Sequence, residues 1–166
     1  MLIAISHVDN GFSAGPWDHA VSGPPTVRVE TTIRAPRTAV WAVLVDFARY
    51  PEWNPFTVRV KTTGRVGDTV SMDVMMGGKL MRLRERMRLY EPEHRFGWGL
   101  RILRGLLLDC TRVQELECLD DERTLYRCHE AFHGLLVPLF FRRYEERIQE
   151  GFAAMAKALK RRVEQS

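Results

Sequence analysis

The stretch VPLFFRRYEERIQEGFAAMAKALKRRV, residues 137–163, has an apolar side chain at every third or fourth position. The side chains between these positions are largely Arg, Lys and Glu. This period predicts an amphipathic helix of about 25 residues, roughly 40 Å long. The apolar stripe consists of Val137, Phe141, Tyr144, Ile148, Phe152, Met155, Leu159 and Val163. A helix of this length needs a broad apolar surface to cover, and the preceding sequence must supply that surface.

The preceding residues, from 56 to 132, alternate apolar and polar side chains in short runs separated by turn residues. Alternation with a period of two predicts β-strands, and a short connection such as Gly77-Gly78 predicts a hairpin. The predicted strands cover residues 56–61, 70–76, 81–89, 96–100, 106–119 and 124–132. We therefore expect the long helix to lie across one face of an antiparallel meander.

The residues before this meander predict one more strand and two short helices. TVRVETTIR, residues 26–34, alternates as a half-buried strand does, and Ala35-Pro36 ends it. RTAVWAVLVDF, residues 37–47, has helical spacing, and RYPEWNPF, residues 49–56, is typical of a second short helix or turn. The order of elements predicts an α+β protein.

Length and composition limit the classes of protein to consider. The chain has 166 residues, and we expect one domain over residues 26–166 after an irregular arm, residues 1–25, that is rich in Gly and Pro. No apolar stretch approaches the roughly 20 residues of a membrane span, and the start has no signal-peptide pattern, so we expect a cytoplasmic protein. The net charge is +4 and the sequence has no nucleic-acid-binding motif, so we expect no nucleic-acid partner. For the oligomeric state we expect a monomer or a homodimer.

The cysteine content argues against a disulfide framework and against a zinc site. The three cysteines are Cys110, Cys118 and Cys128, an odd and small number with no CxxC pair. We expect buried or half-buried thiols, no metal and no cofactor.

The block IRAPRTAVWAVLVDFARYPEWNPF, residues 33–56, resembles the opening of the SRPBCC superfamily, which includes START, birch-allergen-like and bacterial polyketide cyclase/dehydrase proteins. Further segments resemble the family in the same order, namely the turn at residues 64–68, EPEHRFGW at 91–98 and HEAFHGLLVPL at 129–139. The resemblance covers roughly residues 26–163. It implies a helix-grip fold, in which a curved antiparallel sheet of about seven strands wraps around a long C-terminal helix, with two short helices after the first strand.

The resemblance also implies a cavity between the sheet and the long helix. Members of the superfamily bind lipids, sterols, hormones or polyketides, and some catalyse cyclisation or dehydration in the cavity. A shared fold does not specify one activity. We therefore expect the partner to be a small hydrophobic molecule, bound either as cargo or as the substrate of a cyclase or dehydratase.

Polar side chains on the inward faces of the strands are the candidates for chemistry. Glu85 shares a face with Met87, and a carboxyl group in an apolar wall is a candidate general acid or base. Alternation alone leaves the inward face of residues 106–119 open, but the family resemblance favours the face of Arg112 and Gln114. Arg112 would then fix a carboxylate, phenolate or enolate, or pair with Glu85.

The last strand adds Glu130 to this group of charged side chains. We expect catalytic roles for Glu85, Arg112 and Glu130, and ligand-binding roles for Trp53, Met72, Met87, Phe96, Trp98, Gln114, Tyr126 and Phe132. An alternative is that the three charged residues form a structural salt-bridge network without catalysis.

Four arginines, Arg82, Arg84, Arg86 and Arg88, alternate with the apolar residues of one strand and predict a basic outer face of the sheet. One interpretation is a solvated surface that is balanced by glutamates such as Glu115 and Glu117. The other is a docking surface of a regulatory module, for example for an acidic carrier protein.

Overall fold

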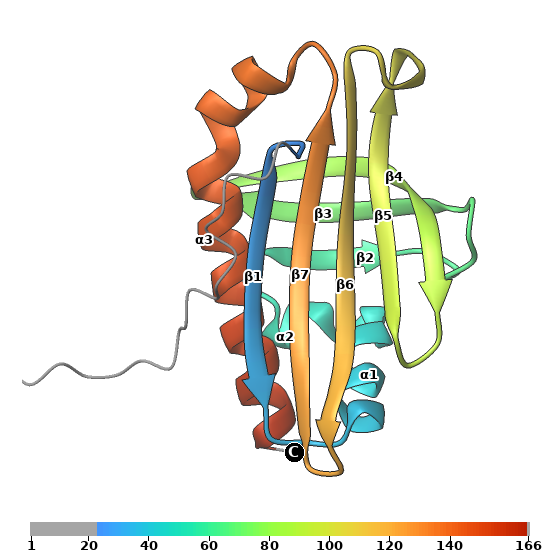
Figure 1. Ribbon diagram of the computed structural model, residues 1–166, viewed down its shortest axis with the longest axis vertical. Helices are drawn as coiled ribbons and strands as arrows, with labels where there is room; N and C mark the ends of the chain where they lie inside the picture. Colours follow the sequence, from blue (N-terminus) through green and yellow to red (C-terminus); the bar gives the residue numbers. More distant parts are fainter. Residues whose placement is uncertain (1–22, 166) are drawn as a thin grey trace, which may run out of the picture.

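A computed structural model describes residues 23–165, and within them the elements follow the predicted order (Figure 1). The strands are β1 (Thr26–Ile33), β2 (Thr57–Lys61), β3 (Thr69–Met76), β4 (Lys79–Glu91), β5 (Arg95–Ile102), β6 (Leu108–Asp120) and β7 (Arg123–His133). The α-helices are α1 (Arg37–Val45), α2 (Tyr50–Trp53) and α3 (Val137–Glu164), with short 3-10 turns at Phe47–Arg49 and Leu103–Gly105.

The strands form one antiparallel sheet in the order β1-β7-β6-β5-β4-β3-β2. Strands β2 to β7 are neighbours in sequence order, as in a meander, while β1 joins the free edge of β7. Figure 1 shows that the sheet curls, so that β2 and β3 run across the direction of β6 and β7. The curl gives the sheet a concave face, on which a cavity can form once a helix covers it.

The long helix α3 covers this face, as its apolar stripe predicts. It packs lengthwise along β1 and also contacts α1, β3 and β7 (Figure 1). The part from Ile148 onward is the better buried, with Ile148, Phe152, Met155 and Leu159 in the core. Tyr144, nearer its N-terminus, is only half-buried. The fold is therefore the predicted helix grip, more tightly packed under the second half of the helix than under the first.

One strand departs from strict alternation. The pairing of β4 with β5 shifts register between Met87 and Leu89, which marks a β-bulge. Strict alternation over residues 81–89 predicts that Leu89 lies on the inward face with Met87, and this is wrong. Leu89 lies beside the outward Gly97, where a Cβ atom would be 3.3 Å from Leu89 Cδ2. The ring of Tyr90 faces inward instead and lies 5.6 Å from that of Trp41. The extra residue of a bulge reverses the faces that follow it.

The four arginines of β4 lie on the outer face, as predicted, but their acidic partners differ from those expected. Two of the arginines pair with Asp73 and Asp109, at 3.9 and 2.7 Å between nitrogen and oxygen. The prediction that Glu115 and Glu117 balance this face is wrong. The register places these glutamates farther along β6, where Glu117 pairs with Arg127 of β7.

The cysteines are partly as predicted. Cys110 and Cys128 are buried, but Cys118 is exposed, contrary to the expectation. The reason is that β6 extends beyond the covered part of the sheet, where residues 117–120 are all exposed.

The described chain begins beside the end of β7. Phe132 N donates a hydrogen bond to Pro25 O (3.0 Å) just before β1 starts. Residues 1–22 of the predicted arm, which covers residues 1–25, lie outside the described residues. Among residues 23–165, no helix has both the length and the apolar character needed to cross a membrane.

Candidate functional site

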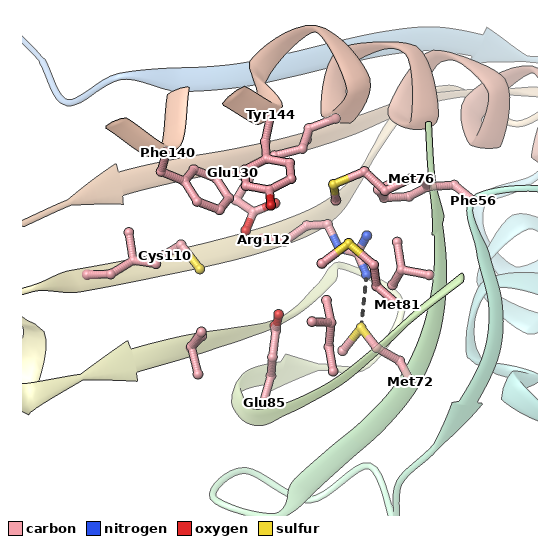
Figure 2. Close-up of a pocket in the computed structure, with 15 residues that line it drawn as sticks. Phe56, Met72, Met76, Met81, Glu85, Cys110, Arg112, Glu130, Phe140 and Tyr144 are labelled. Carbon is pink, nitrogen blue, oxygen red and sulfur yellow. Dashed lines mark hydrogen bonds between the residues drawn. The ribbon is translucent and has the colours of Figure 1, made fainter. Parts of the chain in front are cut away.

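A cavity of about 210 Å³ lies between the concave face of the sheet and the first half of α3 (Figure 2). Its wall is mostly apolar, from methionine, aliphatic and aromatic side chains of β3 to β6 and α3. Three charged residues complete the lining: Glu85 from β4, Arg112 from β6 and Glu130 from β7. These are the three residues for which the sequence predicts catalytic roles.

Arg112 is the one charged residue among residues 23–165 that is fully buried, at 5% exposure. The side chain lies inward because β6 alternates with Cys110, Arg112 and Gln114 on the buried face, which decides the parity that alternation left open. The guanidinium carbon lies 5.0 Å from the centre of the Trp98 ring and 5.6 Å from that of Phe152. Aromatic faces stabilise a cation without using its N–H donors.

The donors of Arg112 are only weakly engaged by the protein. Nη1 donates to Thr57 Oγ1 at 3.3 Å, and Nη2 donates to Met72 Sδ at 3.8 Å, as the dashed line in Figure 2 shows. Nε is buried without a hydrogen-bond partner in the protein. A buried guanidinium with an orphaned donor has the capacity to bind an acceptor that enters the cavity.

Glu85 points into the cavity from β4 (Figure 2). Burial and the nearby Glu130 together raise the pKa of this carboxyl from 4.5 to about 7, against the opposing effect of Arg112. The carboxyl group is therefore close to half-protonated at neutral pH. A group with a pKa near the working pH can donate or accept a proton.

Glu130 lies directly opposite Arg112 in the pairing of β6 with β7. Burial raises the pKa of Glu130, while Arg112 and the thiol of Cys110 oppose the rise. The cavity thus holds one cation and two carboxyl groups whose charged forms are disfavoured by burial. At neutral pH its charge depends on how many of these carboxyl groups keep their protons.

The alternative of a salt-bridge network has no direct ion pair to support it. Within residues 23–165, no ion pair of 4.0 Å or less joins Arg112 to Glu85 or Glu130. The three groups influence one another through space only. The arrangement leaves room for a ligand between them.

Of the eight side chains predicted to bind a ligand, Met72 lines the cavity and the other seven do not. Those seven are Trp53, Met87, Phe96, Trp98, Gln114, Tyr126 and Phe132. Phe96 and Trp98 are covered by Trp41 of α1 and by Phe47, which follows α1, with ring centres 5.7 to 6.0 Å apart. The short helices therefore fill this end of the concave face with aromatic packing.

The remaining members of this group are held by their own partners. Tyr126 donates a 2.8 Å hydrogen bond to Gln114 Oε1 in the core. Phe132 packs edge-on against Phe141, with ring centres 5.0 Å apart, and Trp53 packs against Tyr50 at the same distance. These side chains belong to the packed core next to the cavity and do not line it.

The sequence prediction missed the residues that close the cavity from the helix side. Phe140, Tyr144 and Ile148 of α3 line it, as do Phe56 and Cys110 of the sheet side. Tyr144 and Ile148 belong to the apolar stripe seen in the sequence, whereas Phe140 lies beside it. Periodicity cannot tell which part of a stripe faces a space rather than a packed side chain.

A second apolar space, of about 550 Å³, adjoins the cavity at the N-terminal end of α3. Leu100, Leu108, Phe140 and Tyr144 line both spaces, so they stand between the inner cavity and this outer groove. Arg142 and Arg143 lie at the margin of the groove. A ligand longer than the inner cavity could extend past these four side chains.

The described residues do not gather a set of metal ligands. Within residues 23–165, no three His, Cys, Asp or Glu side chains are grouped so that they could hold a metal ion. What the site offers is a cation, two carboxyl groups and an apolar wall.

Comparison with known proteins agrees with this architecture. The profile of the family described as polyketide cyclase/dehydrase and lipid transport matches residues 24–164. No curated protein sequence matches the chain. The structure is similar to the Zhui aromatase/cyclase of Streptomyces sp. R1128, with a TM-score of 0.66 at 19% identity over 84% of this chain and 93% of that one.

Two further solved structures show the same likeness. A START superfamily protein of Mycobacterium smegmatis has a TM-score of 0.66 at 18% identity, over 84% of this chain and 97% of that one. Norcoclaurine synthase of Thalictrum flavum has a TM-score of 0.64 at 18% identity, over 87% of this chain and 98% of that one. At such identities the likeness concerns the fold, and it confirms the predicted helix grip.

Proposed function

We propose that this chain, which belongs to the polyketide cyclase/dehydrase and lipid transport family, binds a small hydrophobic molecule that carries one acidic oxygen. The observation that carries the proposal is the buried guanidinium of Arg112, whose Nε has no partner in the protein. The acidic oxygen binds to this guanidinium, and the apolar part of the ligand lies against the methionine-rich wall.

The size of the cavity limits the ligand. An engineered protein cavity of about 150 Å³ holds benzene, whereas drug-sized ligands occupy about 300 to 1,000 Å³. The inner cavity, at about 210 Å³, therefore fits a molecule of one or two rings, or one end of a longer chain. The rest of a longer molecule would extend into the outer groove.

The electrostatics of the cavity favour an anionic group over a neutral one. A buried cation without a close counter-ion is costly, and an anionic ligand offsets that cost. Protonated carboxyl groups at Glu85 and Glu130 would add hydrogen-bond donors rather than repulsion. Because the pKa of Glu85 is about 7, we expect binding of an anionic ligand to weaken as the pH rises through 7.

A titration with two matched probes tests the proposal. Naphthoic acid and naphthalenemethanol share the same two rings and differ in the acidic oxygen. We expect the wild type to bind the acid at least about tenfold more tightly, since pairing with a buried charge is worth about 2 kcal/mol or more. In Arg112→Met this preference should disappear, as isothermal titration calorimetry would show.

Gln114→Met is the matched control, because Gln114 lies two residues away on the same face of β6 but does not line the cavity. This variant should keep the preference for the acid. An equal affinity of the wild type for the two probes, or an unchanged preference in Arg112→Met, would contradict the proposal. If the preference for the acid depends on Arg112 as proposed, native mass spectrometry of protein purified from its host would identify the physiological ligand.

A second candidate function is a cyclase or dehydratase reaction, and the pKa of Glu85 favours it. A carboxyl group with a pKa of about 7 can remove a proton next to a carbonyl group, and Arg112 can stabilise the resulting enolate oxygen. One structural neighbour is named an aromatase/cyclase. In this case turnover should rise with pH through 7, opposite to anion binding, and Glu85→Gln should abolish it.

A third candidate role, docking of an acidic carrier protein, belongs to the outer face of β4. A hollow of about 320 Å³ is lined there by Arg84, Arg86, Arg88 and Arg101. Arg84 and Arg86 are exposed, whereas Arg88 and Arg101 already pair with Asp109. Arg84→Glu with Arg86→Glu should weaken carrier binding and reduce its dependence on salt. Carrier binding that is unchanged in this variant would exclude the face as a docking surface.

A further inference from the structure

The outer groove opens among exposed apolar side chains from two loops, the end of β5 and the start of α3. We name Ile102, Leu103, Leu106, Leu135, Leu136 and Leu139 the leucine rim. Leu103, Leu106, Leu135 and Leu139 are 60 to 71% exposed. Ile102, Leu136 and Leu139 also line the groove. An exposed apolar cluster of this kind beside a cavity marks an interaction surface rather than scattered surface leucines.

The structure holds these side chains outward rather than leaving them free to fold back. Leu135 N donates to Leu106 O at 3.0 Å, and Leu136 N donates to Leu107 O at 2.9 Å, so the two loops are tied together. Leu103 has φ of 48° and Arg104 has φ of 55°, in the left-handed region that costs a residue with a Cβ atom about 1 kcal/mol. Strain of this kind is stored where function requires it.

The segments that carry the leucine rim are basic, and the nearest acidic residue of the β5–β6 loop, Asp109, is already paired with Arg88 and Arg101. Residues 101–108 and 133–144, which supply both loops, contain no Asp or Glu. They contain Arg101, Arg104, Arg142 and Arg143. Arg101 pairs with Asp109, whereas the other three are exposed beside the apolar cluster. Apolar side chains surrounded by arginines match a surface with an apolar interior and anionic headgroups.

We propose that the leucine rim inserts into the surface of an anionic lipid bilayer, so that the groove opens into the membrane. The inference rests on the proposed function, because it makes the membrane the source or destination of the hydrophobic ligand. The leucines lie among the acyl chains and Arg104, Arg142 and Arg143 contact lipid phosphates. A second copy of the chain fits less well, since a symmetric contact would bring the same arginines together. An acidic protein would match the arginines but not the leucines.

Flotation with lipid vesicles tests the proposal, using protein without added ligand. One set of vesicles contains equal parts of phosphatidylcholine and phosphatidylglycerol, and the other contains phosphatidylcholine alone. We expect the wild type to float with the mixed vesicles, less with phosphatidylcholine alone, and less at high salt. No flotation of the wild type with mixed vesicles would overturn the proposal.

Variants separate the apolar contribution from the charged one. Leu103→Asn with Leu135→Asn should lose at least about tenfold in vesicle affinity, and Asn tolerates the positive φ at position 103. Arg142→Gln with Arg143→Gln should lose about fivefold per arginine on mixed vesicles, and little on phosphatidylcholine alone. The matched control is Val66→Asn with Leu119→Asn, two exposed apolar residues outside the leucine rim.

The control pair should bind vesicles like the wild type, and an equal loss in the control and in the leucine variant would overturn the proposal. The proposal would also be overturned if the wild type did not bind vesicles but bound an acidic carrier protein, and the leucine variant lost that carrier binding. Titration with naphthoic acid in vesicle-free solution keeps the two proposals apart. The leucine variant should retain that binding, because neither Leu103 nor Leu135 lines the cavity or the groove.

Discussion

Arg112 occupies its position because aromatic rings, rather than carboxylates, surround its guanidinium. Trp98 and Phe152 lie on it, and Thr57 and Met72 accept its weak hydrogen bonds. The carboxyl groups of Glu130 on β7 and Glu85 on β4 stay beyond ion-pair distance. A cation stabilised by rings keeps its hydrogen-bonding capacity for a ligand.

Glu85 makes stability depend on pH. The folded pKa is about 7 against an ordinary 4.5, so the folded state keeps a proton that the unfolded chain releases in this range. The contribution is fully present below about pH 4.5 and is lost as the pH rises through about 7. Glu85→Gln cannot ionise, so it should be more stable than the wild type by on the order of 2 kcal/mol at about pH 8.

Urea unfolding at about pH 5 and about pH 8 checks this prediction, because the difference between variant and wild type should appear mainly at the higher pH. Glu122→Gln, at the exposed β6–β7 hairpin, is the control and should change stability equally at both pH values. The same pH dependence in Glu85→Gln and in the wild type would show that Glu85 does not keep its proton in the folded state.

At the scale of elements, one glycine sets how closely α3 approaches the sheet. A Cβ atom on Gly151 would lie 2.1 Å from Cδ2 of Phe56, whose ring packs edge-on against Phe152 and lines the cavity. Glycine inside a helix costs about 1 kcal/mol relative to alanine. Gly151 therefore lowers the helix propensity of α3 at the point where the helix contacts Phe56 of the cavity wall.

Gly151→Ala should therefore destabilise the protein in spite of the better helix propensity. The methyl group must displace the ring of Phe56, and overpacking of this kind costs about 1 to 3 kcal/mol. Chemical denaturation measures the change in the free energy of unfolding. Ala154→Gly, at an exposed position of the same helix, gives the propensity effect alone and should lose about 1 kcal/mol. Greater stability in Gly151→Ala would mean that Phe56 moves aside easily.

At the scale of the whole molecule, the concave face is divided into a packed end and an open end. The short helices and their aromatic side chains fill one end, and the cavity and groove occupy the other. Four side chains, Leu100, Leu108, Phe140 and Tyr144, lie between the cavity and the groove. Phe140 is bulky and half-buried. Access from the leucine rim to Arg112 therefore depends on how these side chains move.

Phe140→Ala should open this passage. Removing the ring joins the two spaces, so a long probe such as dodecanoic acid should associate faster and bind more tightly, while naphthoic acid changes little. Stopped-flow fluorescence with a dansyl-labelled fatty acid measures the association rate. Phe141→Ala is the matched control, because Phe141 packs against Phe132 and lines neither space. Equal acceleration in both variants would point to general loosening of α3.

The sequence predicted much of the fold because alternation and helical period report directly on which side of an element is buried. The order of elements, the inward face of β7 and the places of Glu85 and Glu130 follow from such patterns, whereas alternation left the inward face of β6, and with it Arg112, open. Leu89 was assigned to the wrong face because a bulge is one extra residue in a pairing, and the pairing is not visible in a single strand. Cys118 is exposed rather than buried or half-buried, because β6 extends beyond the covered part of the sheet.

The strands, the long helix and the faces of Glu85 and Glu130 could be predicted from the sequence pattern, since each depends on a residue's own position in a strand or helix. The helix grip and the inward face of Arg112 were expected only from the resemblance to the SRPBCC superfamily. The tertiary structure decided which inward residues line a cavity and which are packed. Phe96 and Trp98 are inward but covered by Trp41 and Phe47. Periodicity gives the direction of a side chain, whereas the space in front of it depends on what other elements bring there.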